Sequence, residues 1–150
     1  MEVENVKKVE EKKEGEEEDA TTNYVVAPFD KAPTLTRPLE EILRDLNKRV
    51  PDSLIKNNSI SWYHANRMLS FYAPGWCGEI RDVIYSDNGS VTVVYRVTVR
   101  GTDGEVHRES TGTVFLNNGK YQDPVAAAEE VAFRRACARF GLGLHLYHED

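Results

Sequence analysis

A strict two-residue alternation from Val91 to Arg100 is the feature that most constrains the fold of this chain. Because successive side chains of a strand point to opposite faces, one face of this segment carries Val91, Val93, Tyr95, Val97 and Val99. The other face carries Thr92, Val94, Arg96, Thr98 and Arg100. The segment therefore predicts a strand with one face on a core and one face in water.

Two further strands are expected beside this one. Residues 78–86 also alternate, and Asn88-Gly89 in the sequence DNGS is typical of a tight hairpin turn. After the turn GTDG, residues 105–116 (EVHRESTGTVFL) are too polar to be buried on both sides. The three strands predict an antiparallel meander.

Helical periodicity precedes the meander. Residues 37–50 predict a helix with Thr36 as its candidate cap and Pro38 in its first turn. Its apolar residues recur at i, i+3, i+4 and i+7, as Leu39, Ile42, Leu43 and Leu46. A second helix is expected from Ser61 to about Tyr72, with one side formed by Trp62, Ala65, Leu69 and Tyr72.

A third helix is expected after the meander. Asp123 is its predicted N-cap, Pro124 occupies its first position, and Gly141 ends it as a left-handed C-cap. The predicted fold class is α+β, in which a three-stranded antiparallel meander packs with flanking helices in the order helix, three strands, helix.

The acidity of the chain belongs to its first segment. The net charge is -6 over 150 residues, and residues 1–20 hold nine acidic residues against four lysines, which leaves -1 for residues 21–150. Residues 1–23 contain too few large apolar side chains to offset the entropy of ordering. They predict a disordered acidic tail before a single folded domain, residues 24–150.

Several function classes have no support in the sequence. Cys77 and Cys137 lack metal-type spacing and predict two reduced thiols in or near the core. The four histidines show no metal spacing, no glycine-rich phosphate loop is present, and His107 has no nearby candidate nucleophile. We expect no enzyme, no metal and no cofactor. The sequence contains no run of about 18 apolar residues, no secretory signal and no transit-type N-terminus. It therefore predicts a soluble intracellular protein with no membrane partner.

The predicted third helix carries basic residues opposite an apolar face formed by Phe133, Ala136, Cys137 and Phe140. The basic residues are Arg134, Arg135 and Arg139, and the short side chains between them are Ala127, Ala128, Val131 and Ala138. Such a surface admits a bulky partner and suits phosphate contact. The alternative is a solvated face with a Glu130–Arg134 pair, and the helix alone favours that alternative.

The predicted sheet carries a second group of arginines. Arg96 and Arg100 share one face, and Arg81 and Arg108 on neighbouring strands join them if the register allows. Four arginines on a wet face make a basic platform. Cross-strand pairing with Glu79, Glu105 and Glu109 is an equally good interpretation of the same pattern.

Aromatic residues add one more candidate. Trp62 and Trp76 are expected to pack in the core. Tyr63 lies one position off the apolar stripe of its helix and is the better candidate for stacking on a base.

The segment AAAEEVAFRRACARFGLGLHLY resembles the signature helix of the Rad-fifty-two family of single-strand annealing proteins, in which an alanine-rich helix ends in a basic pair and a Phe-Gly step. The likeness extends through ISWYHANRMLSFYAPGW and DNGSVTVVYRVTVRGTDGEVHRESTG and covers about residues 60–147. The chain is most similar to the plant organellar branch of Rad-fifty-two-like DNA-binding proteins.

The resemblance implies a subunit of a self-associating ring that holds single-stranded DNA in a basic groove and anneals complementary strands in recombination-dependent DNA repair. It implies no catalytic residue. A mitochondrial or chloroplast location follows from the branch, with the nucleus as an alternative. Duplex DNA and RNA are alternative partners, and a recombinase partner is left open.

The resemblance also assigns residues. Arg134 and Arg135 match the basic pair of the inner strand-binding groove, and Arg100 matches a basic position of a second, outer DNA site. A further basic position falls on Ala138, with Arg139 one step along, and another falls on Trp62.

Lys120, in the turn before the last helix, is only loosely placed. Two other function classes stay open at this point: an RNA-binding module for organellar transcripts, and a small α+β ligand-binding domain or enzyme that uses His107.

Overall fold

The predicted meander is present as a three-stranded antiparallel sheet in the order β3-β4-β5. The computed structural model describes residues 37–116 and 119–148, so the predicted acidic tail and the Thr36 cap lie outside the described residues. The strands are β3 (Cys77–Tyr85), β4 (Ser90–Gly101) and β5 (Gly104–Phe115). The fold class is α+β, as the alternating pattern indicates.

The register of the sheet sets which residues share a face. Arg96 on β4 pairs with Glu79 on β3 and with Glu109 on β5. The β3–β4 register shifts between Ile80 and Asp82, so Arg81 is the extra residue of a bulge. The inner face of β4 is formed by valines that are fully buried, Val91, Val93, Val97 and Val99.

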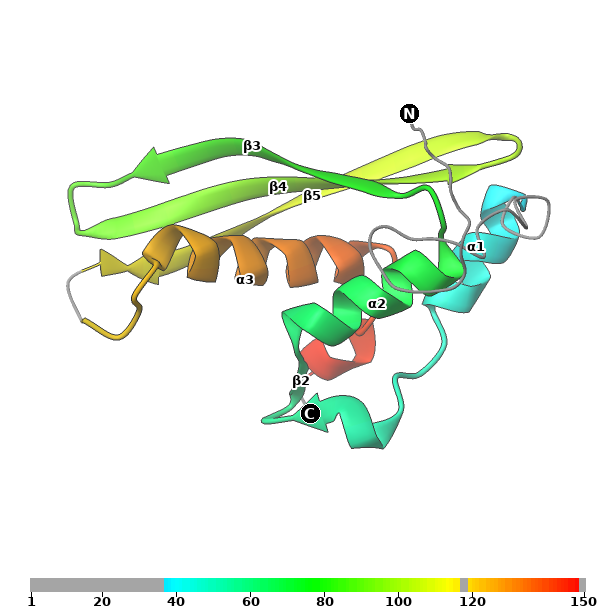
Figure 1. Ribbon diagram of the computed structural model, residues 1–150, viewed down its shortest axis with the longest axis horizontal. Coiled ribbons are helices and arrows are strands. Elements are labelled where there is room, and N and C mark those ends of the chain that lie inside the picture. Colours follow the sequence, from blue (N-terminus) through cyan, green and yellow to red (C-terminus); the bar gives the residue numbers. More distant parts are fainter. Residues whose placement is uncertain (1–36, 117–118, 149–150) are drawn as a thin grey trace, which may run out of the picture. The chain divides into compact units, whose positions relative to one another are not determined.

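Helix α3 (Pro124–Arg139) lies along the inner face of the sheet, against β4 and β5 (Figure 1). Gly112 on β5 makes this close approach possible, because a Cβ there would collide with backbone atoms of Ala128 and Ala132. The predicted apolar face of α3 is confirmed, since Phe133, Ala136, Cys137 and Phe140 are all buried.

The ends of α3 follow the sequence signals. The side chain of Asp123 accepts a hydrogen bond from the backbone N–H of Ala126 at 3.0 Å. At the other end, Gly141 has φ +107°, and the N–H of Leu142 donates to the carbonyl of Cys137 at 3.1 Å. This bond and the left-handed glycine form a Schellman-type cap. Asp123 and Gly141 are therefore confirmed as the cap residues.

The first helix is shorter than predicted. Helix α1 is Leu39–Leu46, whereas the periodicity suggested residues 37–50. Pro38 has extended backbone angles and precedes the helix. After Leu46, the Asn47 side chain donates to the carbonyls of Leu43 at 3.0 Å and Phe140 at 3.2 Å, which caps α1 and ties it to the end of α3.

Helix α2 (Trp62–Tyr72) packs against α3 on the side away from the sheet (Figure 1). Ser61 caps it by accepting a hydrogen bond from His64 N at 3.1 Å. Trp76 is half-buried, as expected for a core residue, and its ring centroid lies 5.8 Å from that of Phe133. Trp62 lies at the edge of the core, because 40% of it stays exposed.

A short hairpin between α1 and α2 was not predicted. It consists of the 3-10 turn η3 (Asp52–Leu54) and the two-residue strands β1 (Ile55–Lys56) and β2 (Ser59–Ile60). Asn57 and Asn58 both have positive φ, +53° and +58°, as a two-residue I′ turn requires. The chain ends its described part in the 3-10 turn η5 (Leu144–Tyr147).

Candidate nucleic-acid interface

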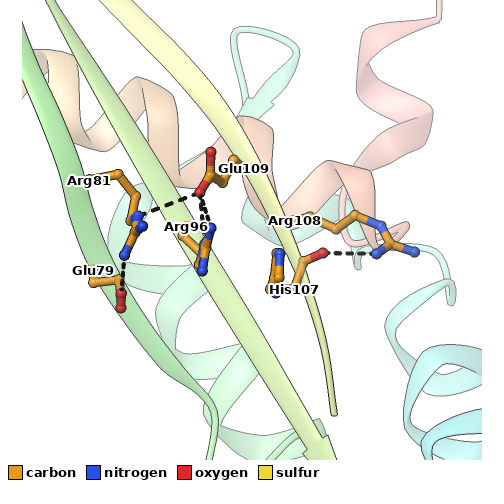
Figure 2. Close-up of polar contacts among 6 residues, drawn as sticks. All are labelled: Glu79, Arg81, Arg96, His107, Arg108 and Glu109. Atoms are coloured by element: carbon orange, nitrogen blue, oxygen red, sulfur yellow. Dashed lines mark hydrogen bonds and ion pairs between the residues drawn. The ribbon is translucent and has the colours of Figure 1, made fainter.

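Two arginines of the outer sheet face share one carboxylate. Arg96 Nε donates to Glu109 Oε2 at 2.7 Å, and the Arg81 guanidinium lies 3.6 Å from the same oxygen. Arg81 Nη1 also donates to Glu79 Oε1 at 3.2 Å. Figure 2 shows these four side chains gathered across the three strands. The cross-strand pairing that the pattern allowed is therefore what the register produces.

The third arginine of this face is paired in the same way. Arg100 Nε donates to Glu105 Oε1 at 3.1 Å, and its Nη1 donates to the carbonyl of Gly75 at 3.1 Å. The hydrogen bond to Glu105, with a contribution from Cys77, raises the pKa of Arg100. Three glutamates thus match three arginines, and the outer face has little net positive charge.

Arg108 does not belong to this face, which corrects the predicted four-arginine platform. It pairs in register with Val97, whose side chain is on the buried inner face. Its guanidinium lies 5.5 Å from the ring centroid of Phe140 and donates to the carbonyl of His107 at 2.8 Å. Figure 2 shows Arg108 apart from the Arg81–Arg96–Glu109 cluster.

Arg134 on α3 is held by neutral oxygens. Its Nη1 donates to Ser59 Oγ at 3.3 Å and to the carbonyl of Ile60 at 3.2 Å, both on the β1–β2 hairpin. Its Nε donates to the backbone carbonyl of Glu130 at 3.3 Å, so the predicted side-chain ion pair with Glu130 is not formed. No carboxylate therefore neutralises the charge of Arg134, and three hydrogen bonds hold its guanidinium in place.

The three arginines of α3 share this lack of a carboxylate partner. No ion pair found among residues 37–116 and 119–148 involves Arg134, Arg135 or Arg139. Arg135 and Arg139 are exposed, and Arg134 is half-buried. This contrasts with the arginines of the outer sheet face.

Arg134 and Arg135 line a surface pocket of about 280 Å³. Its walls come from the β1–β2 hairpin, α3 and the segment that follows α3, and consist of Asn58, Ser59, Ile60, Val131, Arg134, Arg135, Leu142, Gly143, Leu146 and Tyr147. The sequence motif had indicated the two arginines. It had not indicated Ser59 or Asn58, because these residues are remote in sequence and meet α3 only through the unpredicted hairpin.

Tyr147 adds an aromatic ring with a hydroxyl group to the pocket lining, and 52% of this residue is exposed. Partial burial raises the pKa of its phenol, and the nearby charges of Arg134 and Arg135 oppose this rise. The sequence reasoning missed this residue as well. Its only signal was that the family-like segment ends there.

The short side chains of α3 have a different role from the one expected. Ala128 and Ala138 are buried, and Ala128 lies over Gly112 of β5. The short side chain of Ala128 therefore lets the helix approach the sheet, and neither buried alanine is available to a partner. Ala127 and Val131 are half-buried, and of the four only Val131 lines the pocket.

The remaining predicted residues are dispersed. Tyr63 is 54% exposed on α2, where its hydroxyl accepts a hydrogen bond from Arg67 at 3.1 Å. The Lys120 ammonium lies 5.4 Å from the ring centroid of Tyr121, in the connection between β5 and α3. Arg139 is exposed at the last position of α3. None of these three residues lines the pocket.

The possible metal ligands of the described part of the chain are dispersed. Among residues 37–116 and 119–148, no three His, Cys, Asp or Glu side chains are grouped so that they could hold a metal ion. Cys77 and Cys137 are both free thiols, and burial raises the pKa of Cys137. No helix in the described ranges is long and apolar enough to cross a membrane.

Two relatives in Arabidopsis thaliana are similar to this chain. It is 64% identical over 142 residues to "DNA repair RAD52-like protein 2, chloroplastic", and this match covers 85% of the chain and 71% of the relative. It is 55% identical over 125 residues to "DNA repair RAD52-like protein 1, mitochondrial", and this match covers 77% of the chain and 71% of the relative. No family model matches the chain. No solved structure matches it either.

Proposed function

The chain belongs to the RAD52-like family of plant DNA repair proteins, and we propose that it binds single-stranded DNA at the Arg134–Arg135 pocket and anneals complementary strands. The names of the relatives support a role in DNA repair and an organellar location, in chloroplast or mitochondrion. They favour DNA repair over the RNA-binding alternative that the sequence left open.

The observation that carries this proposal is the pair of arginines without carboxylate partners. When a guanidinium is held by carbonyl and hydroxyl oxygens, no carboxylate offsets its charge, and it retains N–H donors for a phosphate. The pocket presents Arg134 from one side of α3 and exposed Arg135 beside it. Both guanidinium groups therefore stand at one surface pocket that a phosphate can approach.

Annealing requires binding without base readout. Two complementary strands have to be held by their phosphates, so that the bases remain able to pair while charge repulsion between the strands is reduced. Phosphate contacts carry no sequence information, and a pocket with two arginines meets this requirement. Self-association into a ring would repeat the pocket along one strand and let several subunits bind it at once.

The test compares two double variants with the same change in charge. Arg134→Gln with Arg135→Gln removes both pocket arginines but keeps much of their aliphatic length. Arg81→Gln with Arg96→Gln removes two paired arginines of the outer sheet face. Since hydrogen bonds to charged groups contribute about 1.5–3 kcal/mol each, we expect the pocket variant to lose at least about 100-fold in affinity for single-stranded DNA.

The sheet variant should bind nearly as well as the unmodified protein. The salt dependence of log K should also decrease only in the pocket variant, by about 0.7 for each phosphate that is no longer neutralised. Light scattering checks that both variants keep the same mass in solution. Strong binding by the pocket variant, or equal losses in both variants, would contradict the proposed site. Competition between DNA and RNA strands of the same sequence measures the preference between the two nucleic acids.

A further inference from the structure

The pocket holds an exposed aromatic ring beside its two arginines, and this combination is more than a phosphate requires. Tyr147 is half-exposed and lines the same cavity as Arg134 and Arg135. Both guanidinium groups are close enough to affect the pKa of its phenol. We propose that Tyr147 stacks on a nucleobase whose neighbouring phosphate is bound by the arginine pair. This inference rests on the proposed function and adds a base-binding part to the same site.

The lining of the pocket supports a nucleotide unit rather than a free phosphate. A phosphate needs only N–H and O–H donors, which Arg134, Arg135 and Ser59 supply. Most of the remaining wall is apolar and includes Ile60, Val131, Leu142 and Leu146, while Asn58 adds a polar amide. A nucleotide presents both a charged phosphate and a flat, weakly polar base, so it matches both parts of the wall. A volume of about 280 Å³ lies just below the usual range of ligand sites, so the pocket suits an occupant no larger than one such unit.

The same hairpin fixes the arginine and the turn that carries the ring. Ser59 and Ile60 accept hydrogen bonds from Arg134. Asn58, next to them in the hairpin, donates from its side chain to the carbonyl of Leu146 at 3.2 Å. Because Leu146 precedes Tyr147 in η5, the hairpin contacts both the phosphate donor and the turn that carries the aromatic ring. A site that is arranged before binding loses less conformational entropy when the strand binds.

Stacking on a tyrosine agrees with a protein that anneals strands of any sequence. Every base has an aromatic face, so stacking tolerates all four bases. It also contributes no charge, and its loss should leave the salt dependence of binding unchanged. These two properties separate the role of Tyr147 from that of the arginines in an experiment.

The experiment uses Tyr147→Leu and, as its matched control, Tyr147→Phe, which keeps the ring and removes only the hydroxyl. Each variant is titrated with a single-stranded oligonucleotide and with an abasic strand of the same length. We expect Tyr147→Leu to bind the normal strand roughly 5- to 150-fold more weakly, with an unchanged salt slope. On the abasic strand it should bind like the unmodified protein, and Tyr147→Phe should bind like the unmodified protein on both.

Three outcomes overturn the inference: equal affinity of Tyr147→Leu for the normal strand, an equal loss on the abasic strand, or a loss in Tyr147→Phe as large as in Tyr147→Leu. Photo-crosslinking of the unmodified protein to a strand that contains 5-iodouracil provides a measurement that needs no folded variant. The adduct should map to Tyr147, and an adduct elsewhere contradicts stacking at this residue. If the unmodified protein binds no single-stranded DNA, the proposed function itself fails, whereas the outcomes above leave it standing.

Discussion

The outer sheet face and helix α3 each present three arginines, but they differ in what those arginines contact. On the sheet, Arg81, Arg96 and Arg100 each lie within ion-pair distance of a glutamate. On α3, Arg134 is held by uncharged oxygens. Counting arginines therefore does not locate a basic surface in this protein. The carboxylates around them decide where positive charge remains.

The difference has a physical consequence for any polyanion. A guanidinium that is already paired with a carboxylate must break that pair to bind a phosphate, or bring the negative charge close to it. An arginine whose guanidinium donates to carbonyl oxygens meets neither obstacle. We therefore expect α3 to contribute most of the affinity and the outer face little, unless its glutamates are neutralised.

The largest effect is expected from Gly112→Ala, which tests how the α3 arginines depend on helix packing. The added Cβ would collide with backbone atoms of Ala128 and Ala132, and a backbone atom cannot rotate away. The helix must shift, at a cost of about 1–3 kcal/mol or more in the free energy of unfolding. Arg134 would then leave the hairpin and binding of single-stranded DNA should be largely lost, while the ion pairs between β3, β4 and β5 remain.

Chemical denaturation and DNA titration measure the two parts of this prediction. Thr111→Ala is the matched control, because Thr111 is exposed on the same strand and its replacement creates no collision. It should change stability by less than about 0.5 kcal/mol. A Gly112→Ala protein with the stability and affinity of the control would show that the position of α3 does not matter for the arginine pair.

The two arginine groups also differ in how far the sequence predicted them. Alternation and turn residues predicted the sheet, its turns and the faces of Arg96 and Arg100, because those signals are local. The strand register depends on contacts between strands, so local sequence signals do not give it. It placed Arg108 opposite Val97, on the inner face of the sheet. The bulge that brings Arg81 into the cluster has no sequence signal that we could use.

For α3, helical projection separated the buried face from the arginines, but it did not show what surrounds them. The partners of Arg134 lie about 75 positions earlier in the chain, in a hairpin with strands of only two residues. Such strands are too short for a period to be recognised. The Asn57-Asn58 pair was the remaining signal for that turn, because asparagine tolerates positive φ. Projection singled out the basic pair but favoured a solvated face for it, and only the resemblance to a family assigned it to DNA binding.

Glu109→Gln is expected to raise the affinity for single-stranded DNA, by less than Gly112→Ala lowers it. This change removes the carboxylate that contacts both Arg81 and Arg96. The outer face then becomes basic, and the protein should bind single-stranded DNA more tightly at low salt. Its salt slope should increase by about 0.7 for each additional phosphate that the outer face neutralises.

Glu41→Gln on α1 makes the same change in net charge at an exposed position, and Glu41 forms none of the ion pairs found among residues 37–116 and 119–148. If both variants bind more tightly by the same factor, the effect comes from net charge alone, and pairing does not distinguish the two faces. An increase in affinity restricted to Glu109→Gln would show that the glutamate suppresses binding at the outer face.

The smallest effect is expected in the reactivity of the two thiols, which report separately on the two regions. Cys77 is half-buried on β3 opposite Thr98, on the face of Arg96 and Arg100, and Cys137 lies on the buried face of α3. Because burial raises the pKa of Cys137, its reactive thiolate is suppressed, and a thiol reagent should modify only Cys77 in the folded protein. With bound single-stranded DNA, the rate at Cys77 should stay unchanged if the strand follows the α3 pocket. Strong protection of Cys77, with Cys137 still unreactive as the internal control, would place a strand on the outer face and remove the distinction between the paired and unpaired arginines.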